Sequence, residues 1–153
     1  SAINYNIIRF ADVLLMAAEC EVEVGSLATA TNYVNLVRTR AANPAGFVIQ
    51  NGKPAANYVI SNYATFADKA TARAAVQFER KLELSGEGHR FYDLVRWGTA
   101  ATVLNAFLAY ESKLLPTAYS GGKFTAGKDE YQPIPQTQID YQGKDVLTQN
   151  PGY

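Results

Sequence analysis

The 153-residue sequence has only one cysteine and one histidine, and it has no excess of charge of either sign. Because 14 Lys and Arg residues balance 14 Asp and Glu residues, we expect no nucleic-acid partner. The one cysteine, Cys20, cannot form an internal disulfide, so packing must hold the fold together. His89 has no second His, Cys or close acidic pair at ligand spacing, so we expect neither a metal site nor a cofactor.

Long hydrophobic runs are also missing. No stretch approaches the ~20 consecutive apolar residues that a membrane span needs. Residues 1–6 have neither the basic segment nor the apolar segment of a secretory signal. We therefore expect either a cytosolic protein or one whose targeting segment is missing from this chain.

Two local sequences lack the features of reactive or phosphate-binding sites. Cys20 lies between two glutamates and has no basic neighbour in sequence to stabilise a thiolate, so we expect a buried small apolar residue there. Residues 86–88 are Gly-Glu-Gly, without the preceding strand and the third glycine of a phosphate-binding loop. Neither sequence indicates catalysis.

The first 44 residues are predicted to form a helical hairpin. Apolar residues at three- and four-residue steps indicate a helix from Ile7 to Val24, and Gly25 suits its C-terminus. A second helix is expected from about Leu27 to Ala42, and so short a turn makes the two antiparallel. The first helix has a second apolar face, which is typical of a helix sandwiched between neighbours. That face consists of Phe10, Val13, Ala17 and Val24.

A loop and a second helical hairpin are expected to follow. Residues 45–68 are expected to form a long surface loop with a short strand at 47–49. The second hairpin is expected over residues 69–110. Its helices run from about Lys69 to Leu84 and from about His89 to Tyr110.

Residues 111–153 are expected to form a loop and an extended tail. The turn sequence at 120–123 predicts a small hairpin, and two prolines keep 131–136 extended. No secondary structure is expected in 140–153 beyond a turn. The sequence therefore predicts a single, mainly α-helical domain, made of two hairpins of the tetratricopeptide kind with long loops.

The densest polar cluster surrounds the junction between the two helices of the second hairpin. Glu79 and Glu83 lie four residues apart on one helix face, and with His89 nearby they could do acid–base chemistry. No nucleophile or oriented triad accompanies them. We therefore favour an ion-pair lattice in which Glu79, Glu83 and Glu87 face Arg90 and Arg96, and we do not expect an enzyme.

Several other positions leave alternatives open. Arg38 and Arg40 suit an anion, but arginines at a helix C-terminus also favour the helix dipole, and we prefer this second account. Trp97 could stack on a sugar, although a lone Trp on an apolar helix face most often belongs to the core. Exposed loop aromatics are better stacking candidates. These candidate ligand-binding residues are Tyr58, Tyr63, Phe66 and Tyr119.

Four segments of the sequence together form a recognisable pattern. They are IRFADVLLMAAE at 8–19, NLVRTRA at 35–41, ERKLEL at 79–84 continuing in GEGHRFYDLVRWG at 86–98, and YQPIP at 131–135 with QNPGY at 149–153. In this order and spacing they resemble the SusD/RagB family of outer-membrane nutrient-binding lipoproteins found in Bacteroidetes-type bacteria. The resemblance covers nearly the whole chain, but only the C-terminal part of the family's longer architecture.

This resemblance implies a largely helical protein that a lipidated N-terminal cysteine anchors to the outer face of the outer membrane. It implies a binding lid over a TonB-dependent transporter of the SusC type, which captures oligosaccharides or, in some branches, peptides. The signal, the lipidation cysteine and the N-terminal repeats are missing from this chain. The family's glycan-contacting aromatics are expected upstream of it, and the matched segments are interpreted as framework.

Two functional hypotheses follow. The first is the C-terminal portion of a SusD-like protein that binds glycans at the cell surface for carbohydrate uptake. The alternative is a self-sufficient tetratricopeptide-like module that binds a peptide or a partner protein. For this chain alone, the second apolar face of the first helix predicts an exposed apolar patch.

Overall fold

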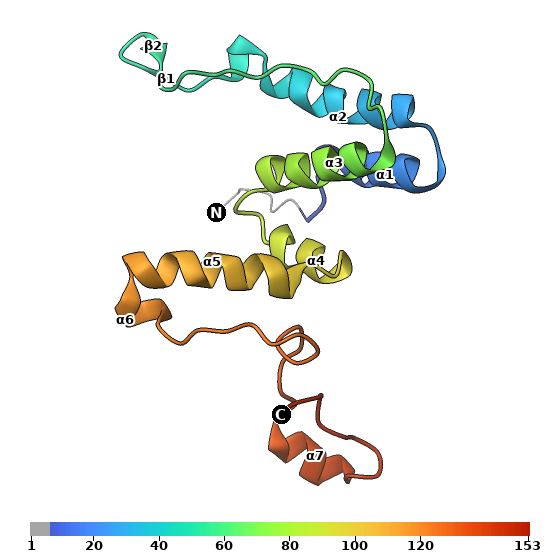
Figure 1. Ribbon diagram of the computed structural model, residues 1–153, viewed down its shortest axis with the longest axis vertical. Coiled ribbons are helices and arrows are strands. Elements are labelled where there is room, and N and C mark those ends of the chain that lie inside the picture. Colours follow the sequence, from blue (N-terminus) through green and yellow to red (C-terminus); the bar gives the residue numbers. More distant parts are fainter. Residues whose placement is uncertain (1–6) are drawn as a thin grey trace. The chain divides into compact units, whose positions relative to one another are not determined.

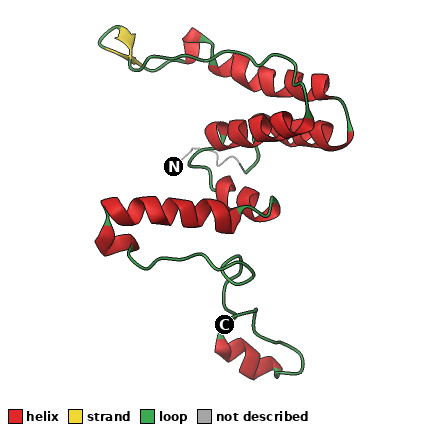
Figure 2. Ribbon diagram, viewed as in Figure 1, coloured by secondary structure: helices red, strands yellow, loops and turns green. Residues whose placement is uncertain are grey.

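The computed structural model describes residues 7–153 and divides into two compact units, Ser1–Gly88 and His89–Tyr153. Helices dominate the described chain, which holds one sheet of two short strands (Figures 1 and 2). The prediction of a mainly α-helical fold is confirmed. The expectation that residues 1–6 carry no secretory signal concerns a segment outside the described residues.

Three helices of equal length form the first unit: α1 (Phe10–Val24), α2 (Leu27–Ala41) and α3 (Lys69–Glu83). The turn between α1 and α2 consists of Gly25 and Ser26, and the Ser26 hydroxyl caps α2 by accepting a hydrogen bond from the Thr29 N–H. The predicted hairpin of α1 and α2 is confirmed (Figure 1). α3 packs against both of these helices.

The core of the first unit lies between the three helices. The small side chains of Ala18, Ala30 and Ala72 are fully buried, which lets the helix backbones approach closely. Larger buried residues fill the remaining space; they are Leu15, Val22, Val34, Val37 and Val76. Each such side chain contributes about 1.5–3 kcal/mol on burial. Apolar packing is therefore the main stabilisation of this unit.

The outward face of α1 is exposed, whereas the sequence predicted a helix covered on two sides and a buried Cys20. Phe10 is 74% exposed and Val24 is 90% exposed, so no described element of the first unit covers the second apolar face. The predicted apolar patch is therefore present. Cys20 lies on this outward side and is exposed, so its predicted burial is wrong. The reason is helical geometry, since two residues from the buried Ala18 correspond to roughly 200° around the helix.

The segment after α2 contains the only sheet of the described chain. A short 3-10 helix, Pro44–Gly46, leads to β1 (Ile49–Gln50), which pairs antiparallel with β2 (Lys53–Pro54). The strand lies slightly later than the predicted 47–49. Asn51 and Gly52 fix its position because both have positive φ, 52° and 74°, as a two-residue hairpin turn requires.

The chain that follows β2 forms no helix or strand up to α3. Side chains of α2 hold it in place. The amide of Asn35 accepts a hydrogen bond from the Tyr63 N–H at 2.8 Å and donates one to the Tyr63 carbonyl at 2.9 Å. One turn further along α2, Arg38 donates from Nε to the Ser61 carbonyl. This loop is thereby strapped to the outside of α2.

The second unit contains four helices: α4 (His89–Arg96), α5 (Ala100–Leu114), α6 (Pro116–Tyr119) and α7 (Gln136–Gln142). The single helix predicted from His89 to Tyr110 is wrong. The chain breaks between α4 and α5 at Gly98, whose φ of 68° a glycine adopts without strain. The core of this unit is small and consists of Leu94, Ala100 and Phe124.

The C-terminal part also differs from the prediction in two places. The small hairpin at 120–123 is wrong, because this segment is a turn after α6 in which the Gly122 N–H donates to the Tyr119 carbonyl at 3.0 Å. α7 occupies part of the tail that was expected to lack secondary structure. The Gln149 amide bonds both backbone groups of Ile134, at 2.7 and 2.9 Å, and so ties the end of the chain to the proline-rich segment.

Candidate functional site

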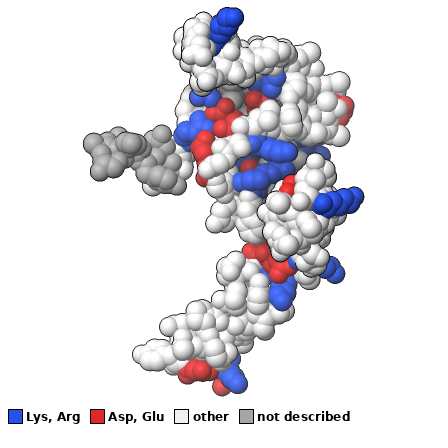
Figure 3. Space-filling model, turned by 90° about the vertical axis from the view of Figure 1, so that its left-hand side faces the viewer, with Lys and Arg blue, Asp and Glu red and all other residues white. Residues whose placement is uncertain are grey.

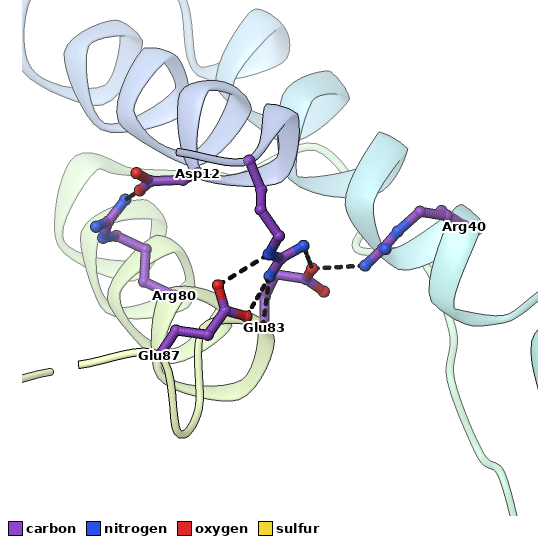
Figure 4. A network of polar contacts seen from close by, with 6 residues as sticks. Asp12, Arg40, Arg80, Glu83 and Glu87 are labelled. Atoms are coloured by element: carbon purple, nitrogen blue, oxygen red, sulfur yellow. Dashed lines mark hydrogen bonds and ion pairs between the residues drawn. The ribbon is translucent and has the colours of Figure 1, made fainter. Parts of the chain in front are cut away.

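The polar cluster predicted around Glu79 and Glu83 is an ion-pair network within the first unit (Figure 4). Arg9, which precedes α1, donates from Nη1 to Glu83 at 2.9 Å, and from Nε and Nη2 to Glu87 at 2.8 and 2.7 Å. Arg40, near the end of α2, donates to the same Glu83 oxygen. Glu83 thus ties the beginning of α1 and the end of α2 to the end of α3.

Two further ion pairs lie deeper between the helices. Arg80 of α3 donates to Asp12 of α1 at 2.8 Å, and both side chains are buried. Arg38 of α2 donates to Glu79 of α3 at 2.6 Å. Each pair crosses from one helix to another, so the charges fix the register in which the helices pack.

The charge distribution of the network is balanced. Hydrogen bonds to Glu87, and then to Glu83, raise the pKa of Arg9 well above its usual value, and burial offsets this only in part. Arg9 therefore stays charged at every pH at which the protein is folded. On the face shown in Figure 3, basic and acidic side chains lie next to each other. The surface shown offers no broad field of one sign.

The geometry of the cluster is that of a framework. Glu79 and Glu83 both direct carboxylate oxygens at arginines, so the ion-pair interpretation of these two residues is confirmed. For these two residues the predicted partners, Arg90 and Arg96, are wrong. Because α3 packs against α1 and α2, its glutamates pair with arginines of α2 and with the arginine that precedes α1. His89 begins α4, in the other unit.

The tryptophan fits neither of its two interpretations completely. Trp97 is half-buried, and the guanidinium groups of Arg90 and Arg96 lie 5.9 and 4.9 Å from its ring centroid. Arg96 also pairs with Asp93 at 2.9 Å. The ring, directly after α4, is therefore a cation–π partner of two arginines of that helix.

Three of the four aromatic candidates lie in the loop after α2. Tyr58 is half-buried and stacks on Phe47 with ring centroids 4.1 Å apart. Tyr63 is half-buried and lies 5.5 Å from Phe66. Phe66 is only 6% exposed, so its predicted exposure is wrong. Thr31 accepts a hydrogen bond from the Phe66 N–H at 3.1 Å and so anchors this residue within the core.

The fourth candidate, Tyr119, ends α6 in the second unit. Its ring is half-buried and lies edge-on to Phe107 of α5, with centroids 6.1 Å apart. Phe107 also lines an open pocket of about 350 Å³ between α5 and the loop after α6. The lining residues are Leu104, Phe107, Leu108, Lys123, Phe124 and Asp129.

A second pocket, of about 360 Å³, lies between α1 and α2 beside the ion-pair network. Its walls are mainly apolar and include Phe10, Leu14 and Leu36, with Arg9 and Arg40 at its edge. Both arginines are engaged with Glu83. This pocket continues the exposed apolar face of α1.

Three side-chain amides, which the sequence did not indicate, each bond both backbone groups of one distant residue. These pairs are Asn35 with Tyr63, Asn105 with Phe124, and Gln149 with Ile134. Asn35 and Gln149 lie within the family-like segments, which marked them as framework. No sequence signal identified their partners, because an amide pairs equally well with any free N–H and C=O of one residue.

The described residues add no other kind of site. Among residues 7–153, no three His, Cys, Asp or Glu side chains are grouped so that they could hold a metal ion. None of the helices in that range is long and apolar enough to cross a membrane.

A helical scaffold with an ion-paired framework and open apolar pockets defines a class of binding protein but no particular family. Comparison of the sequence with known protein families identifies the family. Residues 1–153 match the family model described as the SusD family. The chain belongs to this family, and the predicted resemblance is confirmed.

Individual relatives agree with this assignment. SusD-like protein P25 of Formosa agariphila is 42% identical over 101 residues, which are 66% of this chain and 16% of the relative. SusD-like protein P2 of the same organism is 30% identical over 155 residues, which cover all of this chain and 26% of the relative. The chain thus spans between a sixth and about a quarter of the length of these curated relatives.

Solved structures show the same fold. A SusD homolog from Bacteroides thetaiotaomicron is 34% identical with a TM-score of 0.69, and the match covers all of this chain and 28% of that one. A SusD superfamily protein from Bacteroides vulgatus is 30% identical with a TM-score of 0.67, and the match covers 95% of this chain and 27% of that one.

Proposed function

We propose that this chain is the C-terminal region of a SusD-family protein that binds glycans at the cell surface for nutrient uptake. The match of the whole chain to the SusD family carries this proposal. The described helices would supply the framework on which a longer protein builds its binding surface. Binding would break no bond in the glycan and would need no cofactor.

The ion-pair network supports the framework role. Three separate family-like segments, 8–19, 35–41 and 79–98, meet in it. Removal of either partner of a buried pair is costly, so these positions are constrained by folding and not by a ligand. A family pattern made of such residues is expected to be common to members that bind different glycans.

We further propose that the longer protein is held at the outer membrane by a lipidated N-terminal cysteine and acts with a TonB-dependent transporter of the SusC type. Family membership supports both points. The exposed outer face of α1 gives this region an apolar surface suited to packing against a further part of such a protein.

The first test is the intact mass and N-terminal analysis of the native protein from membranes of the source organism. We expect a much larger, lipidated species that co-purifies with a TonB-dependent transporter. Its affinity for a panel of oligosaccharides, with chromatography of the glycan before and after incubation, would then show binding without cleavage. A product shortened during incubation would contradict the proposal.

A native product of the size of this chain would favour a second candidate function. In that case the tetratricopeptide-like hairpin of α1 and α2 would bind a peptide. The observation in its favour is the apolar pocket of about 360 Å³ between these helices, which Phe10 and Leu36 line. Ligand screening would then start with peptides that carry an apolar anchor residue.

A further inference from the structure

We propose that the pocket between α5 and the loop 120–129 is a subsite for a neutral sugar ring. The sugar would stack on Phe107, and its hydroxyl groups would bond to Lys123 and Asp129. This inference rests on the proposed function and assigns part of it to residues of this chain.

The aromatic wall of the pocket is accessible and held in place. Phe107 is 49% exposed, and the edge-on contact with Tyr119, at 6.1 Å between centroids, restrains its ring. Leu104 and Leu108 line the same pocket from neighbouring positions on α5, and Phe124 lines it from the loop. A half-exposed aromatic ring within an apolar hollow suits the C–H face of a sugar, which is flat and weakly polar.

The loop that carries Lys123 approaches α5 unusually closely. A Cβ atom at Gly122 would lie 3.3 Å from a methyl carbon of Leu108 and 3.1 Å from the Tyr119 carbonyl, so a glycine allows this approach. On the other side of Lys123, the Asn105 amide bonds the N–H and the carbonyl of Phe124 at 2.8 and 2.9 Å. Lys123 therefore lies between two residues, Gly122 and Phe124, whose backbone positions are fixed against α5.

The acidic group of the pocket is positioned by a tight turn. Asp129 accepts a hydrogen bond from the Thr125 N–H at 2.6 Å, and its own N–H donates to the Thr125 carbonyl at 3.0 Å. A carboxylate has about four acceptor positions, so this bond leaves capacity for a sugar hydroxyl. The ammonium of Lys123 adds donors, and no ion pair of Lys123 is found among the described residues.

The charges of the pocket select the class of sugar. Lys123 and Asp129 contribute one positive and one negative charge, so the pocket has no net charge to attract a uronate or a sulfated sugar. The hydroxyl groups of a neutral sugar can accept a hydrogen bond from the Lys123 ammonium and donate one to the Asp129 carboxylate. The volume of about 350 Å³ is within the usual range for small-molecule sites.

The test is an NMR titration of the full protein, with methyl labels on leucine, against cellohexaose, maltohexaose and hexagalacturonate. We expect a neutral oligosaccharide to shift the methyl signals of Leu104 and Leu108, and the acidic one to leave them unchanged. Phe107→Ala is expected to weaken this response by about tenfold, the usual strength of one aromatic contact. The matched control is Tyr110→Ala on α5, which removes another exposed ring outside the pocket and is expected to leave the affinity unchanged.

The outcomes separate the subsite from the general function. If the protein binds a neutral glycan while the Leu104 and Leu108 signals stay constant, the subsite is refuted and glycan binding stands. Equal affinities of Phe107→Ala and the wild type also refute the subsite, as does equal weakening by Tyr110→Ala. If the wild type binds none of the three oligosaccharides, the subsite is refuted, and the wider glycan panel alone decides the proposed function.

Discussion

The two compact units of this chain differ in the interactions that stabilise each of them internally. The first unit packs three helices around a continuous apolar core and links them with ion pairs between helices. The second unit buries far fewer large side chains, and single amides hold its loops to the helices or to one another. Beyond its apolar core, the first unit is therefore held by ion pairs between its helices, whereas the second, with a smaller core, depends more on individual hydrogen bonds.

The size of these effects follows from burial. Loss of one partner of a buried ion pair leaves a charge without compensation, which costs about 3–5 kcal/mol. Loss of a hydrogen-bonding group opposite a buried backbone costs about 1–3 kcal/mol. Both are large relative to the stability of about 5–15 kcal/mol that is typical of a domain. Substitutions in each unit therefore test whether the two units are stabilised differently.

The largest expected effect is that of Asp12→Ala in the first unit. The substitution removes the buried ion pair between Asp12 of α1 and Arg80 of α3, and we expect the free energy of unfolding to fall by about 3 kcal/mol. Hydrogen exchange followed by mass spectrometry measures this for each unit separately, and faster exchange should be concentrated in α1, α2 and α3. The control is Glu23→Ala, which breaks an exposed pair with Arg73 and should change exchange very little.

An Asp12→Ala protein with wild-type exchange in all three helices would remove the distinction between the units. Equal effects of Asp12→Ala and Glu23→Ala would also contradict it, because burial would then not determine the value of an ion pair.

The next largest loss of stability is expected when one of the amides is removed. The two substitutions are Asn105→Ala in the second unit and Asn35→Ala in the first. Each substitution leaves the backbone of one residue without partners, Phe124 in the first case and Tyr63 in the second. We expect a loss of about 2 kcal/mol for Asn105→Ala. The loss for Asn35→Ala should be smaller, because Arg38 still holds the same loop.

Denaturant unfolding of both variants measures this difference, with the fluorescence of Trp97, the one tryptophan, for the second unit and hydrogen exchange of α1, α2 and α3 for the first. A greater loss in Asn35→Ala would show that the first unit depends on amides as much as the second.

The parts of the fold that the sequence predicted are those in which neighbouring residues determine the structure. The hairpin of α1 and α2 follows from apolar periodicity and the turn at Gly25 and Ser26, which are local signals. The break at Gly98 was missed because the apolar pattern continues across it, and only the backbone angle reveals it. Cys20 was placed on the wrong face because both sides of α1 are apolar.

The candidate site was less predictable because its contacts span long sequence distances. Glu83 was recognised as an ion-pair residue, but its partners Arg9 and Arg40 depend on which helices α3 packs against. Phe66 looked like a loop aromatic, and only its hydrogen bond to Thr31 shows why it belongs to the core. Periodicity describes the faces of a helix and says nothing about the identity of its neighbours.

A smaller effect on stability, but a clear one on association, is expected from Phe10→Ser. Phe10 is a prominent part of the apolar patch on α1, so this chain alone should self-associate through the first unit. Sedimentation at several protein concentrations should show association that Phe10→Ser reduces, with stability within about 0.5 kcal/mol of the wild type. Leu114→Ser on α5 is the matched control in the second unit and should leave association unchanged. A wild-type chain that is monomeric at every concentration would contradict this assignment.

The smallest expected effect is a pH dependence at the start of α3. Hydrogen bonds from the N–H and the hydroxyl of Thr71 lower the pKa of Asp68, the residue that caps this helix. Because the pKa in the folded state lies below that in the unfolded state, the unfolded chain binds more protons as the pH falls, and stability decreases. The contribution of the cap is complete above the unfolded pKa of about 4 and is lost as the pH falls through the lower folded value.

Asp68→Asn keeps an equally good capping side chain but does not titrate, so it isolates this effect. Glu23 has a pKa that Arg73 lowers, and Glu23→Gln in both proteins removes this second contribution. Between about pH 5 and pH 3, the thermal unfolding midpoint should then fall further in the protein that retains Asp68 than in the Asp68→Asn variant. Parallel curves for the two proteins would contradict this prediction, because they would show that the cap contributes equally in both protonation states.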